Sequence, residues 1–341
     1  LILVVTDPDG ARMSLRLRIC LLSPAIALIW TLATSPLHSQ ELTPSFAGVP
    51  AFADEFENAS SPLIEAYDPA FFALRETPVQ RFRKSFYQGA ELLGGYLLDT
   101  GDAAGGLDIT FEEARVGFAV PLGSLDNILV LRPYFRADHL NGPDSVDLPG
   151  TLYNTGVTFF NRKEWSAVIS TTLVVTPSIR SDFTTHENAL RLFGLGLVNY
   201  QCRSDLSLSF GAVYLGRADL PLLPALGATW TPTPQWKIDA MLPRPRIARR
   251  LSKDGGNSES WAYLGGTLGG NTWAVTRDSG MSDELSLRDL RLLVGYEWVQ
   301  AGNRGFFVES GYAFNRSIEF ESSGGEIDLD NALFIEASLK F

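Results

Sequence analysis

Apolar and polar side chains alternate along most of the chain with a period of two residues, from about Phe86 to the last residue. In residues 206–214 every second side chain is apolar, and serine or glycine stands between most of them. Residues 288–298 and 306–314 repeat the alternation, with charged side chains on the second face. Because successive side chains of a strand point to opposite faces, this pattern predicts strands that each have one apolar face.

The links between these segments alternate between short turns and longer loops. Bacterial outer-membrane barrels have an even number of antiparallel strands, with short turns at the periplasmic end and longer loops at the outer end. We therefore predict an all-β fold, an antiparallel up-and-down transmembrane β-barrel of about 14 strands, with about 12 as the alternative count. The predicted strands are 86–98, 107–120, 127–138, 151–161, 165–177, 189–201, 206–215, 225–231, 236–250, 260–268, 272–278, 286–299, 305–319 and 330–341. The short links include 162–164, 202–205, 269–271 and 300–304, and the longer ones 139–150, 178–188, 216–224 and 320–329.

The beginning of the chain predicts secretion. Met13 opens a basic stretch with Arg16 and Arg18, an apolar run follows at 19–34, and small residues follow it up to Ser39. This order of segments is typical of a secretory signal peptide, and an N-terminal membrane anchor is the alternative. No later stretch has the roughly 20 consecutive apolar residues that a transmembrane helix needs. We divide the chain into a start extension plus signal peptide, an N-terminal periplasmic or lumenal extension, and the barrel, at 1–39, 40–85 and 86–341.

Two aromatic features agree with a barrel in the bacterial outer membrane. Five of the six tryptophans after the predicted leader lie within two residues of a predicted short turn, and only Trp261 adjoins a long loop. Indole rings favour the headgroup level of a membrane, where barrels carry aromatic girdles. The chain ends NALFIEASLKF, with Phe341 on the apolar face of the last predicted strand. This end resembles the terminal strand through which the barrel-insertion machinery recognises outer-membrane proteins.

Composition narrows the function classes. The formal net charge of −11 argues against a nucleic-acid partner, because phosphate binding needs clustered lysine and arginine. After the predicted leader only Cys202 remains, and a single thiol forms neither a disulfide framework nor a cysteine-based metal site. We expect no cofactor.

Three segments resemble a family of Gram-negative outer-membrane β-barrel proteins of uncharacterised function. They are IDAMLPRPRIARR at 238–250, W-x-Y-L-G-G at 261–266 and RDLRLLVGYEW at 288–298. The resemblance runs from about residue 86 to the end of the chain, and it implies a fold and a location only.

Charged residues on the second face of the strands are expected to line the lumen. Walls of charged side chains set selectivity in pores, and the same residues can instead form salt bridges that fill a closed barrel. The candidates for a selectivity role are Arg132, Arg136, Asp138, Arg191, Asp289, Arg291, Glu297 and Glu309.

Arg244 and Arg246 form a separate candidate site. If residues 236–250 continue as one strand, both face outward above the apolar band, where guanidinium groups suit lipopolysaccharide phosphates. Pro243 and Pro245 offer two alternatives: a bulge that turns both arginines inward, or structural pairing with nearby acids.

We expect no enzyme. The mature chain has two histidines, His139 and His186, which lie in predicted outer loops and outside any nucleophile motif. The acidic stretch 319–330 lacks the spacing of an EF-hand, so we interpret it as a solvated loop. Our functional prediction is a porin-like channel or transporter for a small solute or lipid-like molecule, in contact with outer-membrane lipid and lipopolysaccharide. The alternatives are a closed structural or adhesive surface barrel, a soluble periplasmic β-protein and a barrel hydrolase.

Overall fold

The computed structural model describes residues 4–6, 12–14, 76–83, 85–101, 106–124, 127–143, 146–214, 222–242 and 244–341. Near the start of the chain, β1 (Val4–Thr6) pairs antiparallel with β2 (Arg12–Ser14), with Val5 opposite Met13. The rest of the predicted signal peptide, and residues 40–75 of the predicted extension, lie outside the described residues.

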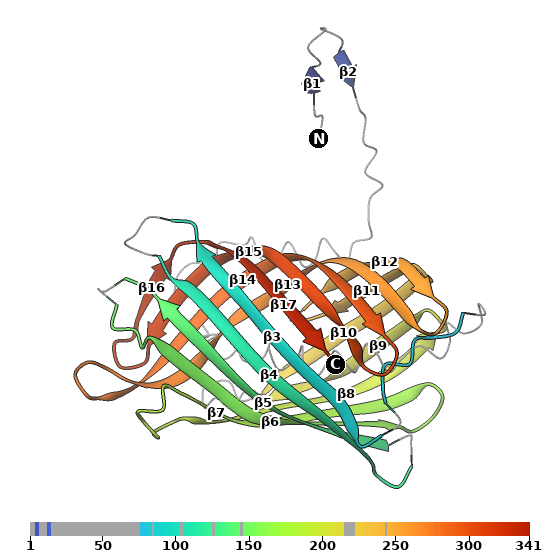
Figure 1. The fold of residues 1–341 in the computed structure, drawn as a ribbon, viewed down its shortest axis with the longest axis horizontal. Helices are drawn as coiled ribbons and strands as arrows, with labels where there is room; N and C mark the ends of the chain where they lie inside the picture. The colour runs from blue at the N-terminus through green and yellow to red at the C-terminus, as the bar shows by residue number, and fades with distance from the viewer. Residues whose placement is uncertain are drawn as a thin grey trace. The chain divides into compact units, whose positions relative to one another are not determined.

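Most of the described residues belong to one closed antiparallel barrel (Figure 1). The first and last wall strands close it, because β17 pairs with both β15 and β3. The short β16 pairs with the far end of β15 and continues the line of β17, so the described strands form a 14-strand wall. The strands are β3 (Tyr87–Asp99), β4 (Asp108–Pro121), β5 (Asn127–Asn141), β6 (Thr151–Glu164), β7 (Ile169–Ser181), β8 (Leu190–Arg203), β9 (Leu206–Tyr214), β10 (Leu222–Thr233), β11 (Trp236–Met241), β12 (Arg246–Asp254), β13 (Ser258–Thr276), β14 (Ser282–Gln300), β15 (Arg304–Phe320), β16 (Gly325–Leu329) and β17 (Ala332–Lys340).

The predicted all-β barrel fold is confirmed, and the strand count of 14 is right although two of its boundaries are wrong. The predicted strand 236–250 is two strands, β11 and β12, joined at 242–245. Pro245 has no N–H to donate to a ladder, which suits the connection that precedes β12. The predicted turn at 269–271 is instead the interior of the continuous strand β13. Gly270 of this segment has a positive φ of 98°, which glycine adopts inside a strand. It lies beside an irregularity in the pairing of β14 with β15, between Arg288 and Leu290.

The turns define two ends of the barrel. Short connections at 165–168, 204–205, 234–235, 255–257 and 301–303 lie at one end, which we call the short-turn end. The connections at 142–150 and 182–189 lie at the other, the long-loop end.

The outward face of the wall is apolar, as the period of two predicts. Leu173, Leu292 and Leu339 point away from the lumen and are 52%, 58% and 54% exposed. Tyr296 and Trp298 flank Phe306 near the short-turn end with ring centroids 5.9 Å apart, an outward aromatic group like those of membrane girdles.

The two tryptophans of β13 lie differently from our expectation. Trp261 lies near the short turn 255–257 rather than beside a long loop. It faces inward, because its strand partners are Glu297 and Arg250. Trp273 lies towards the long-loop end and is 5% exposed. Both tryptophans differ from the expectation because β13 continues through 269–271 instead of turning there.

A dry cluster fills part of the interior at the long-loop end, and we call it the long-loop cap. Leu148 of the β5–β6 connection packs against this cluster, whose members Leu107, Leu152 and Leu285 are 0% exposed. Arg316 is buried beside it and donates hydrogen bonds to the carbonyl oxygens of Leu107 and Asp330, at 2.7 and 2.8 Å. The cap comprises Leu107, Val146, Leu148, Leu152, Trp273, Val275, Leu285, Ile318 and Phe320.

Candidate lumenal site

The inward side chains differ between two parts of the barrel. The middle of β6–β10 presents apolar and hydroxyl side chains to the lumen, and we call it the apolar wall. Thr176 donates a hydrogen bond to Thr158 across this wall at 3.2 Å. The remaining strands, β11–β15, β17 and β3–β5, carry most of the inward acids and bases, and we call them the charged wall. The buried cluster of the apolar wall contains Phe160, Val174, Phe193, Leu195, Leu197, Val213 and Ala225.

Glu309 on β15 is the centre of one group of charges in the charged wall. It is 2% exposed, and its Oε1 accepts hydrogen bonds from Arg244 Nη2 at 2.6 Å and from Tyr263 Oη at 2.5 Å. Tyr263 reaches Glu309 across β14 because Gly295 lies opposite both of them. A Cβ on Gly295 would collide with the Tyr263 ring, so this contact requires glycine. Arg244, which lies between β11 and β12, reaches the same buried carboxylate.

Arg246 continues this group towards the short-turn end. It lies opposite Asp239 of β11, which is 2% exposed, and therefore points into the barrel. Its guanidinium group lies 3.6 Å from Glu297 and 3.8 Å from Asp239. It also lies over the Tyr263 ring, 4.9 Å from the centroid. Each side chain of the group therefore has a fixed partner, which gives the charged wall a defined pattern of potential.

A second group of charges lies on β4 and β5. Arg136 donates three hydrogen bonds to the carboxylate of Asp138, at 2.8 to 3.1 Å. The same guanidinium group lies 4.0 Å from the centroid of the Phe111 ring and 3.8 Å from Glu113. Arg115 binds Glu113 from the other side. Planar guanidinium forks suit such bidentate contacts, and they fix the position of the charges.

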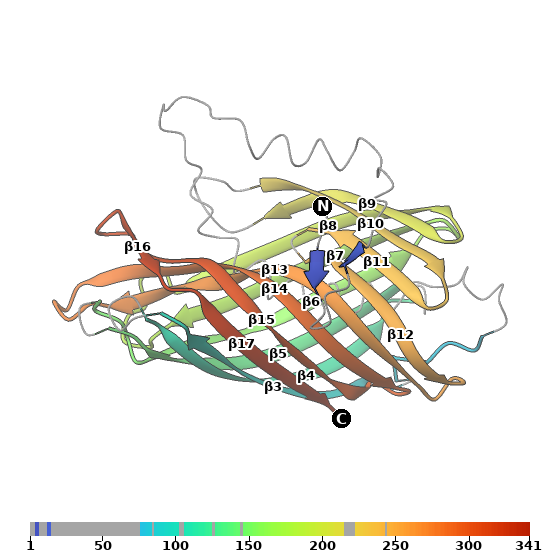
Figure 2. The same cartoon turned by 90° about the horizontal axis from the view of Figure 1, so that it is seen from above.

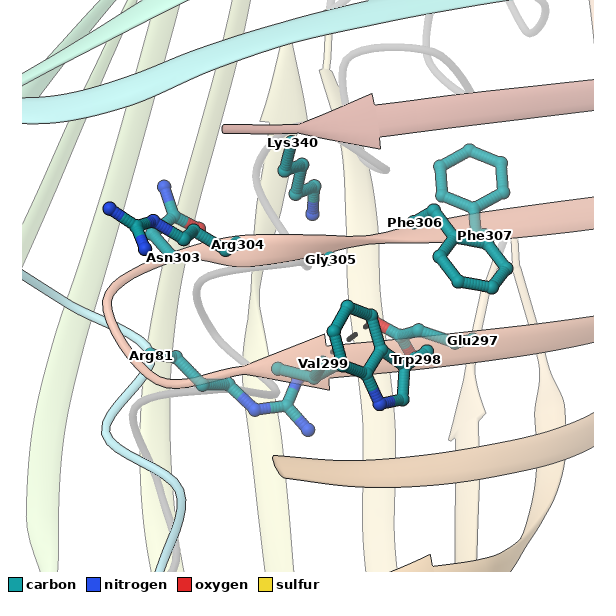
Figure 3. Close-up of a pocket in the computed structure, with 10 residues that line it drawn as sticks. All are labelled: Arg81, Glu297, Trp298, Val299, Asn303, Arg304, Gly305, Phe306, Phe307 and Lys340. Atoms are coloured by element: carbon teal, nitrogen blue, oxygen red, sulfur yellow. Dashed lines mark ion pairs between the residues drawn. The ribbon is translucent and has the colours of Figure 1, made fainter. Parts of the chain in front are cut away.

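Residues 76–83 lie at the short-turn end of the barrel, and Arg81 points towards Glu297 there (Figure 3). Arg81 binds Glu259 at 2.7 Å and lies 3.9 Å from Glu297. Glu76 binds Arg250 at 2.6 Å. The next residue after Arg81, Phe82, packs against the cluster of the apolar wall. This segment, which we call the strap, therefore contacts the charged wall through ion pairs and the apolar wall through a ring.

The structure places all eight predicted lumenal residues on inward-facing positions of their strands. They are Arg132, Arg136, Asp138, Arg191, Asp289, Arg291, Glu297 and Glu309. Arg191 lies at the long-loop end of β8 and binds Glu284 at 2.7 Å. Asp289 binds Arg291 through two hydrogen bonds at 2.7 and 3.0 Å. The selectivity role of these residues remains a prediction.

Of the three alternatives for Arg244 and Arg246, the outward placement is wrong, whereas the inward direction and the pairing with nearby acids are confirmed. Their partners Glu309, Glu297 and Asp239 lie on the inner face, so these guanidinium groups are inside the barrel. The physical reason is the break at the two prolines, after which the register of β12 no longer continues that of β11.

Other predicted features have the following positions. Phe341 exchanges two backbone hydrogen bonds of 3.0 Å with Ala90 of β3, and its side chain is 50% exposed. His139 lies on β5 rather than in a loop, and its Nε2 lies 3.0 Å from Glu112. His186 is exposed in the β7–β8 connection. Within the described ranges, no cluster of three or more histidine, cysteine or acidic side chains is arranged to hold a metal ion.

Sequence reasoning missed several members of the lumenal groups. Arg81 belongs to a segment without periodicity, and its partner Glu259 is 178 residues away. Tyr263 was part of a recognised strand, but its contact with Glu309 spans three strands. A signal was available for Gly295, because a glycine inside a strand often marks the close approach of another group.

Comparisons with known proteins give weak similarities of fold. No protein-family model matches the chain, and no curated protein matches it. A mutant of the TodX monoaromatic hydrocarbon channel aligns at a TM-score of 0.43 and 9% identity, covering 79% of this chain and 93% of that one. A mutant of the porin of Rh. blastica aligns at a TM-score of 0.30 and 9% identity, covering 75% of this chain and 99% of that one. Similarities at this level carry no argument about function.

No helix among the described residues is long and apolar enough to cross a membrane.

Proposed function

We propose that the protein is an outer-membrane channel that passes a small amphipathic solute between the two walls of its lumen. The observation that carries the proposal is a closed barrel with an apolar outward face and a lumen whose inward acids and bases are concentrated on one side. An apolar belt around a closed barrel suits lipid, because all backbone groups are then paired within the wall.

The contacts of the strap support the proposal that the solute is amphipathic. It fits between the walls by presenting Arg81 to carboxylates and Phe82 to the apolar cluster. A small molecule with a charged or polar head and an apolar body offers the same two kinds of contact. Fixed charged side chains on a pore wall set the sign and size of what passes, so we assign the filter to the charged wall.

The test is conductance of the purified full chain in a planar lipid bilayer. We expect stepwise conductance, and a larger conductance when residues 40–85 are removed, because the strap leaves with them. Silence of both proteins, with the barrel shown to be folded by heat-dependent gel mobility, would contradict the channel.

Ion selectivity tests the filter. The variant Glu297→Gln removes a lumenal charge beside Arg81 and Arg246, and we expect it to shift the reversal potential in a salt gradient. The matched control is Glu326→Gln on β16, an exposed carboxylate outside the lumen, which should leave the reversal potential unchanged.

A closed structural barrel is the second candidate, and the long-loop cap favours it. Leu107, Leu152 and Leu285 are completely buried where an axial passage would leave the barrel. Bilayers that stay silent with both the full chain and the shortened chain would favour this candidate.

A further inference from the structure

The strap contributes one acid and one base to contacts with neighbouring strands of the barrel, β12 to β14, which lie side by side in Figure 2. Glu76 accepts a hydrogen bond from Arg250 of β12 at 2.6 Å. Arg81 donates one to Glu259 of β13 at 2.7 Å and lies 3.9 Å from Glu297 of β14. The barrel therefore offers the strap a basic and an acidic contact in one place. We call this place the dipolar site, and its residues are Arg250, Lys253, Glu259 and Glu297.

A bulge in β12 brings the two bases of the site to the same face. In a regular strand, residues three positions apart point to opposite faces. Here the register with β13 shifts at Leu251, whose side chain is 56% exposed. As a result Arg250 lies opposite Trp261 and Lys253 lies opposite Glu259, and these two partners share one face of β13. The bulge thus places both bases on the inner face of the wall.

The acidic and basic halves of the dipolar site are adjacent. Lys253 Nζ lies 4.0 Å from Glu259 Oε2, which is longer than a hydrogen bond. Each of the two also contacts the strap, because Lys253 Nζ lies 3.7 Å from Glu76 and Glu259 Oε1 accepts from Arg81. The side chains of Lys253 and Glu259 are only 16% and 9% exposed, so these attractions are less weakened by water than surface pairs are. A ligand that carries both charges close together therefore fits both halves at once.

Apolar contacts lie next to the charged ones. Phe82 follows Arg81 directly and packs against the cluster of the apolar wall. Val79, on the other side of Arg81 in the strap, is 8% exposed. Arg81 also lines a small pocket together with Glu297 and Phe307 (Figure 3). The strap thus makes the three kinds of contact that a zwitterion with an apolar body would make: cationic, anionic and apolar.

The strap is tied to the barrel independently of the dipolar site. Arg83 Nε donates a hydrogen bond to the Gly302 carbonyl oxygen at 2.7 Å. The Arg83 N–H donates to the Gln88 side chain at 3.0 Å, and the Gln88 amide donates back to the Arg83 carbonyl oxygen at 2.9 Å. A segment tethered beside its binding site acts like a ligand at an effective concentration in the millimolar range. A free ligand at similar concentration can therefore displace Glu76 and Arg81 while Arg83 stays anchored.

We infer that the dipolar site binds a small zwitterionic amphipath, of the class of α-amino acids with an apolar side chain, and that the strap is its tethered competitor. The inference rests on the proposed channel function and identifies its solute class. The ammonium group of the ligand replaces Arg81 on Glu259, its carboxylate replaces Glu76 on Arg250, and its apolar side chain replaces Phe82. A ligand with a single charge leaves one half of the site without a partner, which is costly for shielded charges.

Three probes with the same ring and different heads test the solute class. They are phenylalanine, a zwitterion, phenethylamine, a cation, and 3-phenylpropionate, an anion. Isothermal titration calorimetry on the full chain in detergent micelles at neutral pH measures their affinities. We expect phenylalanine to bind at least about tenfold more tightly than either of the others, because each of these leaves buried polar groups unsatisfied. Equal affinities for the three probes would overturn the inference.

A double variant of the strap tests the competition. Glu76→Gln combined with Arg81→Gln removes the ion pairs of the strap and leaves the dipolar site unchanged, so phenylalanine should bind about tenfold more tightly. The matched control combines Glu326→Gln with Arg203→Gln, two exposed side chains elsewhere, and should leave the affinity unchanged. Heat-dependent gel mobility verifies folding, and Arg81→Gln alone replaces the double variant if that does not fold. Failure of the strap variant to bind phenylalanine would overturn the inference.

Two variants of the site itself, made in the strap variant, assign its halves. Glu259→Gln should weaken the binding of phenylalanine and phenethylamine and leave that of 3-phenylpropionate unchanged. Arg250→Gln should weaken the binding of phenylalanine and 3-phenylpropionate and leave that of phenethylamine unchanged. This crossed pattern requires direct contact with the two charges of the ligand. A uniform loss of all three affinities in both variants would show a merely structural role and would overturn the inference.

Conductance of the same preparations in planar bilayers separates the two proposals. Stepwise conductance without preferential binding of phenylalanine would overturn the dipolar binding site and leave the channel standing. Preferential binding without conductance would overturn the channel and leave a barrel that binds the zwitterion.

Discussion

The two walls of the lumen come from the same kind of strand but are held in place differently. In the charged wall, Glu309 keeps its position through hydrogen bonds to Arg244 and Tyr263. In the apolar wall, Leu195 is 1% exposed and is held by packing against the cluster around it. Hydrogen-bonded charged side chains fix the electrostatic potential of the lumen, whereas packed apolar side chains fix only its shape. The difference teaches that one wall of this barrel is stabilised by paired charges as well as by packing, whereas the middle of the other wall depends on packing.

Among the variants that test this comparison, the replacement of Glu309 with leucine should have the largest effect on the unfolding free energy. It removes the acceptor of Arg244 and leaves that guanidinium group buried near Tyr263 without its carboxylate. Removal of one partner from a buried ion pair costs about 3–5 kcal/mol of unfolding free energy. Urea unfolding in detergent micelles, followed by gel mobility, measures the loss. The exposed Glu326→Leu is the control, and an equal loss in both variants would show that Glu309 stabilises nothing specific.

Replacing Leu195 with alanine tests the apolar wall. The cavity should cost about 2–5 kcal/mol of unfolding free energy, as for other buried leucines. Because no charge changes, the reversal potential in a salt gradient should remain that of the unchanged protein. Leu192→Ala on the outward face of the same strand is the control, and its cost should be smaller. A shifted reversal potential in Leu195→Ala would break the division between filter and packing.

Arg136→Lys sharpens the comparison within the charged wall. A lysine keeps the charge but loses the fork that binds Asp138 at 2.8 to 3.1 Å. We expect a loss of about 1 kcal/mol in unfolding free energy, the net value of one such hydrogen bond. Arg203→Lys beside Asp205, where the arginine is 61% exposed, should change nothing measurable in the same unfolding assay. If both variants lose the same amount, geometry is unimportant in the charged wall.

Replacing Asp182, which lies where β7 pairs with β13, should have the smallest effect on the unfolding free energy. Partial burial acts to raise its pKa, but hydrogen bonds from Thr276 and Thr184 outweigh burial, so the pKa lies below its ordinary value of 3.8. A lowered folded pKa means that the stabilisation is complete above the unfolded pKa and is lost as the pH falls through the folded one. The group is only partly buried and is screened by solvent, so its contribution is under about 1 kcal/mol.

The Asp182→Asn variant measures this contribution. Its unfolding free energy should fall below that of the unchanged protein at neutral pH and approach it in acid. A difference between the two proteins that grows as the pH falls would contradict the assignment.

Much of the barrel and of its inward face could be predicted from the chain. The sequence predicted residues 206–215 as one strand, and the structure has β9 at Leu206–Tyr214. Asp289, Glu297 and Glu309 were placed inward correctly, because a period of two assigns every side chain to a face once a strand is recognised. The apolar outward face makes that assignment strict, since a slip of one residue would place charges on it.

The candidate site was predictable only in part, because its contacts join distant segments. The charges of the strap lie in a segment without a pattern, and the partner of Arg81 is 178 residues along the chain. The inward direction of Arg244 depended on where the strand breaks between two prolines, a choice that local propensity leaves open.

The sequence by itself determined that the strands form a barrel with an apolar outside, and which side chains of each regular strand enter the lumen. Only the tertiary structure decided that Ala274 pairs with Ser181 and that the strap contacts both walls. The physical reason is that the face to which a side chain points is a local property of the extended backbone. Closure of a sheet, by contrast, depends on the lengths and registers of all its strands together.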